Sequence, residues 1–168
     1  MSAYRQKAGD GGTSLAGAEA KPPVAGTARW EHFRHVADIG LRGFGPSLGE
    51  ALEQVALALT AVVAEPESIR PVQAVDFACS APDAEILLFD WLNELVYEMA
   101  TRGMLFSRFE VQVQRTDGEC RLMARAHGEP VDVRRHQPAA EVKGATLSEL
   151  AVGQAPDGSW QAQCIVDV

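Results

Sequence analysis

Two stretches of this sequence place apolar residues at helical spacing, and strand-like alternation occupies much of the remainder. The helical stretches are residues 48–63 and 83–102. Ser47-Leu48-Gly49-Glu50 has the spacing of a capping box, and Gly103 is a typical helix stop. Two helices among many strands must bury their apolar stripes against sheets, which limits the chain to a few layered architectures.

Alternation of apolar and polar residues predicts the strands, and turn signals predict how they connect. Asp117-Gly118 predicts one hairpin, and residues 156–159 predict another turn. Because hairpins dominate and helices do not alternate regularly with strands, we expect an α+β fold with mostly antiparallel sheets and two main helices. The predicted strands are residues 30–34, 39–41, 75–79, 109–113, 122–126, 142–147 with a weak continuation to 152, and 160–168.

Two segments carry less regular signals. Gly40, Gly43 and Gly45 predict a bend or bulge in the second strand. Residues 128–140 hold two prolines and a cluster of charge and predict a loop, in which Arg134-Arg135-His136 is solvated or forms a small contact patch.

Composition bounds the class of protein. Residues 1–28 are rich in Gly, Ala, Pro, Ser and Thr without periodicity, so we expect a disordered extension before a single domain at residues 29–168. A net charge of −8 argues against binding nucleic acid through a general basic surface. Three widely spaced cysteines, with no apolar run of membrane-spanning length, favour a cytoplasmic protein with reduced thiols and no membrane partner.

Two acidic residues far apart in the chain are candidate metal ligands. Asp38 lies at a break between two apolar runs, and Asp167 precedes Val168, which carries the terminal carboxylate. If the two ends lie side by side, three anionic groups converge, and a cation or a basic group must neutralise them. The oxygens of carboxylates suit Ca²⁺, Mg²⁺ or Mn²⁺. The ordinary alternatives are an Asx turn for Asp38 and a solvated strand end for Asp167.

Three further residues are candidates for site chemistry. His32 and His35 lie three apart in a strand-like segment, where such residues point to opposite faces, so they are not expected to bind one metal together. Packing or hydrogen bonding is the ordinary role of each, and His35 is the better candidate for a ligand. Lys143 is either an edge-strand charge that deters aggregation or a cation that meets the carboxylates or a partner's acidic group.

Six short motifs follow one another along the chain. They are His35-Val36-Ala37-Asp38-Ile39-Gly40, Ser47-Leu48-x-x-Ala51, Leu88-x-x-Trp91-Leu92-Asn93-Glu94-Leu95, Gly128-Glu129-x-x-Asp132, Val142-Lys143-x-x-Thr146 and Ile165-Val166-Asp167-Val168. In this order the motifs resemble those of the archease family, and the resemblance runs from about Trp30 to the last residue. Val36 stands where the family usually has Thr, and Gly144 where it usually has Ala.

The resemblance implies an activator rather than an enzyme. Archeases assist an RtcB-type RNA ligase, which joins tRNA exon halves and broken RNA with GTP and Mn²⁺, by promoting its guanylylation and multiple turnover. The implied metal ligands are Asp38, Asp167 and Val168, and the cation is calcium as seen in the family, with Mn²⁺ or Mg²⁺ as alternatives in the cell. Lys143 corresponds to a family lysine implicated in activation, and we group His35 with it as a partner contact.

Two other hypotheses for the function stay open. A metal-dependent hydrolase would use the carboxylates with His35 as its base. A general chaperone or adaptor would bind its partner without any site chemistry. The acidic net charge suits a helper that contacts the ligase rather than RNA.

Overall fold

The computed structural model describes residues 26–168. The predicted extension, residues 1–28, therefore falls mostly outside the described residues, and residues 26–28 lead into the first strand. The elements follow in the order β1 (Arg29–His35), β2 (Asp38–Gly45), α1 (Leu48–Val63), a 3₁₀ turn η1 (Pro66–Ser68), β3 (Gln73–Ala81), α2 (Ala84–Arg102), β4 (Met104–Thr116), β5 (Glu119–Pro130), α3 (Val133–His136), β6 (Gly144–Ala145), β7 (Ala151–Gln154) and β8 (Trp160–Asp167).

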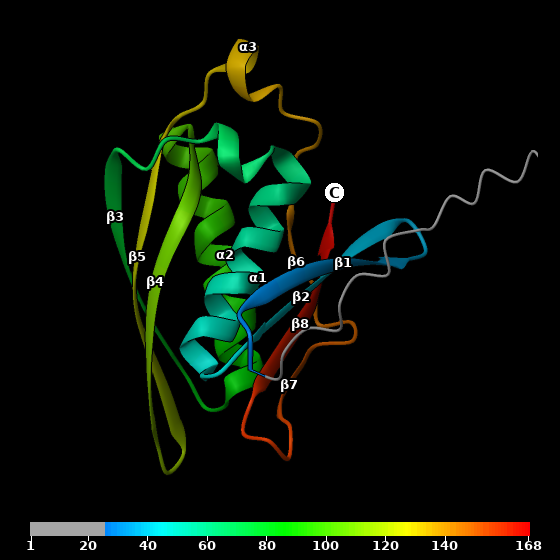
Figure 1. Ribbon diagram of the computed structural model, residues 1–168, viewed down its shortest axis with the longest axis vertical. Helices are drawn as coiled ribbons and strands as arrows, with labels where there is room; N and C mark the ends of the chain where they lie inside the picture. The colour runs from blue at the N-terminus through cyan, green and yellow to red at the C-terminus, as the bar shows by residue number, and fades with distance from the viewer. Residues whose placement is uncertain (1–25) are drawn as a thin grey trace, which may run out of the picture.

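Two antiparallel sheets enclose the two main helices (Figure 1). One sheet has the strand order β1-β2-β8-β6, with β7 also paired to β8, and the other has the order β3-β5-β4. Every recorded pair of strands is antiparallel. The prediction of an α+β fold with mostly antiparallel sheets and two main helices is confirmed.

Local sequence signals mark the start of both main helices and the end of α2. Ser47 caps α1: its hydroxyl accepts a hydrogen bond from the Glu50 N–H (3.2 Å) and donates one to the Glu50 carboxylate (2.8 Å). Asp83 caps α2 by accepting from the Ile86 N–H at 2.8 Å. Gly103 ends α2 with φ +61°, a left-handed conformation that glycine adopts without steric cost.

The core is built around Trp91, which is fully buried on α2. Its indole N–H donates to the Leu52 carbonyl at 3.2 Å and so joins α2 to α1. Phe77 and Phe109 of the three-stranded sheet meet its ring edge-on, with centroids at 5.2 and 6.2 Å. This one side chain therefore connects both helices to that sheet.

Helix α1 also covers the edge of β4 that has no neighbouring strand. Glu53 accepts a hydrogen bond from the Val111 N–H at 2.9 Å, and Thr60 donates to the Phe106 carbonyl at 2.7 Å. Gly49 lies so near this edge that an added Cβ would fall 2.4 Å from the Val111 carbonyl oxygen. Side chains of α1 thus satisfy backbone groups that an edge strand leaves unpaired.

Of the bend or bulge predicted at residues 40–45, the bulge is wrong. The pairing of β1 with β2 and of β2 with β8 runs without a shift of register. The glycines instead allow close packing: a Cβ at Gly43 would lie 2.4 Å from the Ala51 carbonyl oxygen of α1. The irregularity occurs in β4, between Phe106 and Arg108.

The C-terminal third contains more structure, and shorter strands, than the patterns predicted. The predicted loop at residues 128–140 is partly wrong, because β5 continues to Pro130 and α3 follows it. The predicted strand at 142–147 is reduced to the two residues of β6, and its continuation is the separate strand β7. Among the described helices, none combines the length and apolar character needed to cross a bilayer.

Candidate functional site

The first candidate residues lie at the turn of the β1–β2 hairpin. His35 and Asp38 form the last pair of the ladder, so only Val36 and Ala37 connect the two strands. Val36 has φ +47° and is fully exposed. A left-handed, β-branched residue is strained, and this strain lies directly after His35 and two residues before Asp38.

Strand β8 brings the distant acid alongside this turn. Ile39 pairs with Val166, so one further step of the same register brings Asp38 level with Asp167. Asp167 in turn pairs with Gly144 of β6. We call His35, Asp38, Asp167 and Gly144 the cross-strand row, because they lie at the same level on four successive strands.

Asp38 and Asp167 lie on the face of the sheet that points away from the helices, whereas a Cβ at Gly144 would lie 3.1 Å from the Asn93 side-chain oxygen of α2. Ile39 and Val166 pack into the core, and their chain neighbours Asp38 and Asp167 therefore face the other side. Residues level on antiparallel neighbours share a face, with Cβ atoms about 4.5–5.5 Å apart. The two carboxylates thus lie on one surface, Asp38 half-buried and Asp167 exposed.

Neither carboxylate of the row makes a hydrogen bond or ion pair with a described residue, whereas other carboxylates such as Glu31 and Asp76 pair with arginines. Residues 26–168 also contain no group of three or more His, Cys, Asp or Glu side chains arranged to hold a metal. Side chains of these four types therefore do not form a closed cage. A cation at the row would need a further ligand, such as the terminal carboxylate of Val168 or oxygen atoms from outside the chain.

The two histidines face different environments, as their spacing predicted. His32 contacts the Ala58 carbonyl of α1 through Nε2 at 2.7 Å, which is a packing role on the helix side. His35 lies in the row, with Nε2 3.8 Å from the Glu149 carboxylate. Its Nδ1 is buried without a hydrogen-bond partner among the described residues. A buried nitrogen left unpaired costs free energy, so His35 is the more unusual of the two.

Lys143 lies immediately before β6, next to the row. Its backbone N–H donates to the Asp167 carbonyl at 2.8 Å, while its exposed side chain makes no ion pair with a described residue. The ammonium group is therefore available to another molecule. Lys143 precedes β6 rather than lying within a strand, so the edge-strand reading applies less well than the sequence suggested.

Glu149 is a site residue that the sequence did not indicate. Its backbone carbonyl accepts a hydrogen bond from the Gln163 side chain at 2.9 Å, which holds the segment between β6 and β7 against β8. Its φ is +50°, so strained residues occur in both segments that meet at His35. The contact joins positions 114 residues apart along the chain (149 − 35), and no local pattern marks it.

Two of the described cysteines, Cys79 and Cys164, do not provide a reactive thiolate. Burial raises the pKa of the Cys79 thiol to about 11, and burial raises the pKa of the Cys164 thiol to about 11 as well. Cys120 is buried, and all three are free. At neutral pH Cys79 and Cys164 are protonated and unsuited to nucleophilic attack.

Comparison with known proteins places this geometry in a family. Residues 30–168 match the model of the Archease protein family (MTH1598/TM1083), a range that includes the entire cross-strand row. The chain belongs to the archease family. It is 39% identical over 140 residues to protein archease of Pyrococcus furiosus, covering 83% of this chain and 99% of that protein. Protein archease of Methanosarcina barkeri is 33% identical over 141 residues, with 83% and 96% covered.

A solved structure supports the same assignment. The solution structure of Methanobacterium thermoautotrophicum protein 1598 superposes with a TM-score of 0.73 at 30% sequence identity. The superposition covers 83% of this chain and 98% of that one. The resemblance inferred from the motifs is therefore confirmed for the family and for its fold.

One archease motif, Gly128-Glu129-x-x-Asp132, has a structural role in this chain. Glu129 is buried and accepts hydrogen bonds from the Arg70 N–H at 2.9 Å, from Arg135 and from His136 Nε2 at 2.8 Å. The Arg135 hydrogen bond, with those from Arg70 and His136, lowers the pKa of the Glu129 carboxyl to about 2. The Asp132 N–H donates to His136 Nδ1 at 2.9 Å, so Nε2 must carry the proton that is donated to Glu129.

This network corrects the prediction for Arg134-Arg135-His136. His136 is buried and Arg135 is half-buried, and both bond to the buried Glu129 rather than forming a solvated patch. Only Arg134 is exposed as expected. The misleading signal was the charge of the segment, which reflects an internal ion pair with Glu129 rather than a surface.

Proposed function

We propose that this chain is a metal-binding, non-catalytic activator of an RtcB-type RNA ligase that acts in tRNA splicing or RNA repair in the cytoplasm. The observation that carries the proposal is the position of Asp38 level with Asp167 on an open face, without a neutralising group among the described residues. Membership of the archease family supports it further. Asp38, Asp167 and the terminal carboxylate of Val168 are the proposed ligands.

The residues of the row fit a hard divalent cation. Two carboxylates at neighbouring strand positions repel each other, and a cation between them removes that repulsion. Their oxygen atoms suit Ca²⁺, and also Mn²⁺ or Mg²⁺. A bound divalent ion supplies positive charge with coordination positions left for water or for oxygen ligands of a partner.

The residues around the carboxylates would then serve recognition. The Lys143 backbone bonds to that of Asp167, and the exposed Lys143 side chain makes no ion pair with a described residue, so its ammonium group suits an acidic or phosphate group of the ligase complex. Glu149 lies against His35 Nε2, and this contact positions the imidazole at the end of the row. His35 and Lys143 therefore flank the two carboxylates from the β1 and β6 sides.

The alternative of a metal-dependent hydrolase rests on one observation, the unpartnered Nδ1 of His35 next to Asp38. A general base must reach the reacting water, so this buried nitrogen would have to become exposed for the hydrolase mechanism. If the isolated protein hydrolyses a phosphodiester such as bis-p-nitrophenyl phosphate with Mn²⁺, and His35→Ala removes the activity, this reading replaces the activator. The third hypothesis, a chaperone or adaptor, predicts that the protein binds the ligase equally well with and without a metal chelator.

The deciding experiment is single-turnover transfer of GMP from GTP to a cognate RtcB-type ligase at limiting Mn²⁺. Asp38→Asn and Asp167→Asn keep the side-chain size and remove one charge each. We expect either variant to lose at least about tenfold of the stimulation, a loss equivalent to about 1.4 kcal/mol. Ca²⁺ should raise the Tm of the wild type and raise it less in the variants, since a ligand stabilises only the state that binds it.

Asp76→Asn is the matched control, because Asp76 makes an exposed pair with Arg125 on the opposite sheet. Such exposed ion pairs contribute little, so stimulation should remain at the wild-type level. Full stimulation by both row variants would refute the activator mechanism at this site.

A further inference from the structure

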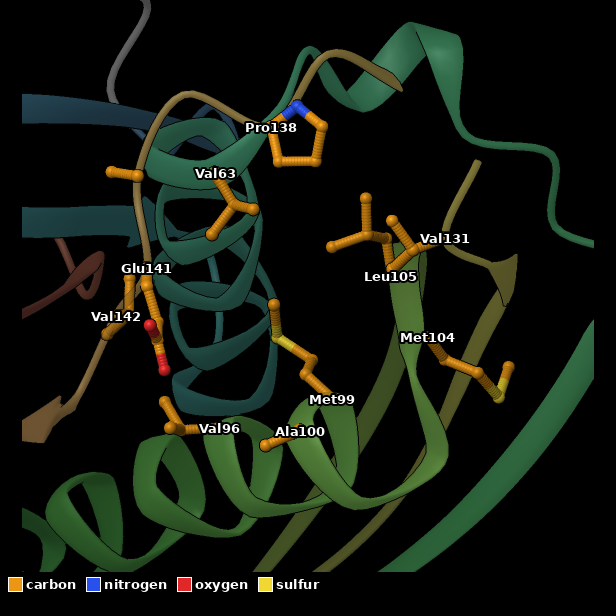
Figure 2. Close-up of a pocket in the computed structure, with 11 residues that line it drawn as sticks. Val63, Val96, Met99, Ala100, Met104, Leu105, Val131, Pro138, Glu141 and Val142 are labelled. Carbon is orange, nitrogen blue, oxygen red and sulfur yellow. The ribbon is translucent and has the colours of Figure 1, made fainter. Parts of the chain in front are cut away.

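An apolar pocket that the carboxylate chemistry does not use lies at the end of the molecule where α1 and α2 finish (Figure 2). It has a volume of about 260 Å³. Helix α2 forms one wall and the segment between α3 and β6 forms another, with the end of α1 and the start of β4 between them. Its lining residues are Val63, Val96, Met99, Ala100, Met104, Leu105, Val131, Pro138, Ala140, Glu141 and Val142.

The segment that walls the pocket is tied directly to the cross-strand row. At one end the Ala139 N–H donates to the Val63 carbonyl, the last residue of α1, at 2.8 Å. At the other end the Lys143 N–H donates to the Asp167 carbonyl at 2.8 Å. Val142 lines the pocket, and the next residue, Lys143, is the one that bonds to the Asp167 backbone of the row.

The lining defines what the pocket can accept. Val63, Leu105 and Val142 are buried and apolar, while Glu141 is the only charged residue among those that line it. Glu141 is exposed and makes no ion pair with a described residue. Small-molecule pockets commonly enclose about 300–1,000 Å³, so this volume suits one or two protein side chains rather than a cofactor.

We propose that this pocket receives an apolar side chain of the ligase, adjacent to a Lys or Arg of the ligase that pairs with Glu141. The inference rests on the proposed function, and it adds a second contact beside the row. An apolar side chain inserted into a desolvated pocket is the usual form of an interface hot spot. The basic neighbour follows from the unpaired carboxylate at the rim and from the net charge of −8 on this chain.

The position of the pocket also explains why one partner would contact both the pocket and the cross-strand row. A protein that contacts Lys143 touches the chain neighbour of Val142, and Lys143 in turn bonds to the Asp167 carbonyl. Filling the pocket would hold Val142 in place, and Val142 precedes the residue that bonds to the Asp167 backbone. The pocket therefore contributes affinity and helps to fix the end of the row.

Methionine methyl groups provide a direct observation of the pocket. Met99 and Met104 line it, whereas Met123 is 62% exposed on the three-stranded sheet. In the full chain labelled with ¹³C-methyl methionine, addition of purified ligase should shift or broaden the Met99 and Met104 signals. The Met123 signal should change only as the larger complex tumbles more slowly. Specific perturbation of Met123 alone would overturn the proposal.

A pocket-filling variant tests the energetic contribution. Ala100 is exposed and lines the pocket, so Ala100→Phe fills part of the volume without touching the row. We expect its affinity for the ligase to fall about tenfold or more. Thr101→Phe places the same ring at the next, exposed position of α2, which does not line the pocket, and should bind like the wild type. Glu141→Lys should weaken binding, and more at low salt than at high salt.

The outcomes separate this inference from the proposed function. Wild-type protein that neither binds nor stimulates a cognate ligase overturns both. Normal stimulation with unchanged Met99 and Met104 signals, or equal affinity of Ala100→Phe and Thr101→Phe, overturns the pocket contact alone. Loss of binding only in Ala100→Phe, with its circular dichroism and Tm like those of Thr101→Phe, supports it.

Discussion

Replacing Val36 with Asn should stabilise the fold. Val36 adopts φ +47°, and its side chain is fully exposed, so the substitution removes no packing. The left-handed conformation costs an ordinary L-residue about 1–2 kcal/mol, and a short polar side chain such as Asn tolerates it better. Most of that strain should be recovered, and we expect the free energy of unfolding to rise by about 1 kcal/mol.

For a domain of this size, such a gain raises the Tm by about 3–4 °C, which calorimetry resolves. Val72→Asn is the matched control: Val72 is 68% exposed and does not have a positive φ. The same chemical change there should leave the Tm within about 1 °C, since surface substitutions are usually within about 0.5 kcal/mol. Equal shifts in the two variants, or a lower Tm for Val36→Asn, would refute the strain argument.

Two further predictions concern stability. Gly43→Ala should destabilise the protein by about 1–3 kcal/mol in urea unfolding, because its Cβ would lie 2.4 Å from the Ala51 carbonyl oxygen. Gly153→Ala is the control and should be nearly neutral, since no atom lies within 4 Å of its added Cβ. Equal urea midpoints for the two variants would contradict this prediction. The Glu129 pKa is lowered from 4.5 to about 2 in the folded state, so its stabilising contribution is complete above about pH 4.5 and is lost as the pH falls toward 2. Glu129→Gln should flatten the stability–pH profile in that interval, and a profile parallel to that of the wild type would show that the Arg135 pair does not control it.

Local signals in the sequence were sufficient for much of the fold. The cap at Ser47, the stop at Gly103 and the Asp117-Gly118 turn each depend on residues within a few positions, and each lies where it was predicted. The glycines of β2 were misinterpreted because their role is set by α1, which packs against them. A glycine pattern alone does not distinguish a bulge from a close approach.

For the site as well, the sequence identified individual residues but not the contacts that depend on tertiary packing. The sequence identified Asp38 and Asp167 as candidate residues, and the strand register then brought them level. It could not show that Glu149 meets His35, or that Glu129 reaches the backbone of Arg70, 59 residues away. These contacts depend on tertiary placement, and their local sequences resemble ordinary polar loops.

The cover that α1 provides for β4 bears on how the chain reaches its folded state. Glu53 and Thr60 bond to β4 residues 58 and 46 positions away, so these contacts form only after the chain between them has closed into a long loop. Until α1 docks, β4 presents unpaired backbone groups to any other unfolded chain. Early docking of the helix would therefore protect the nascent domain from association through that strand.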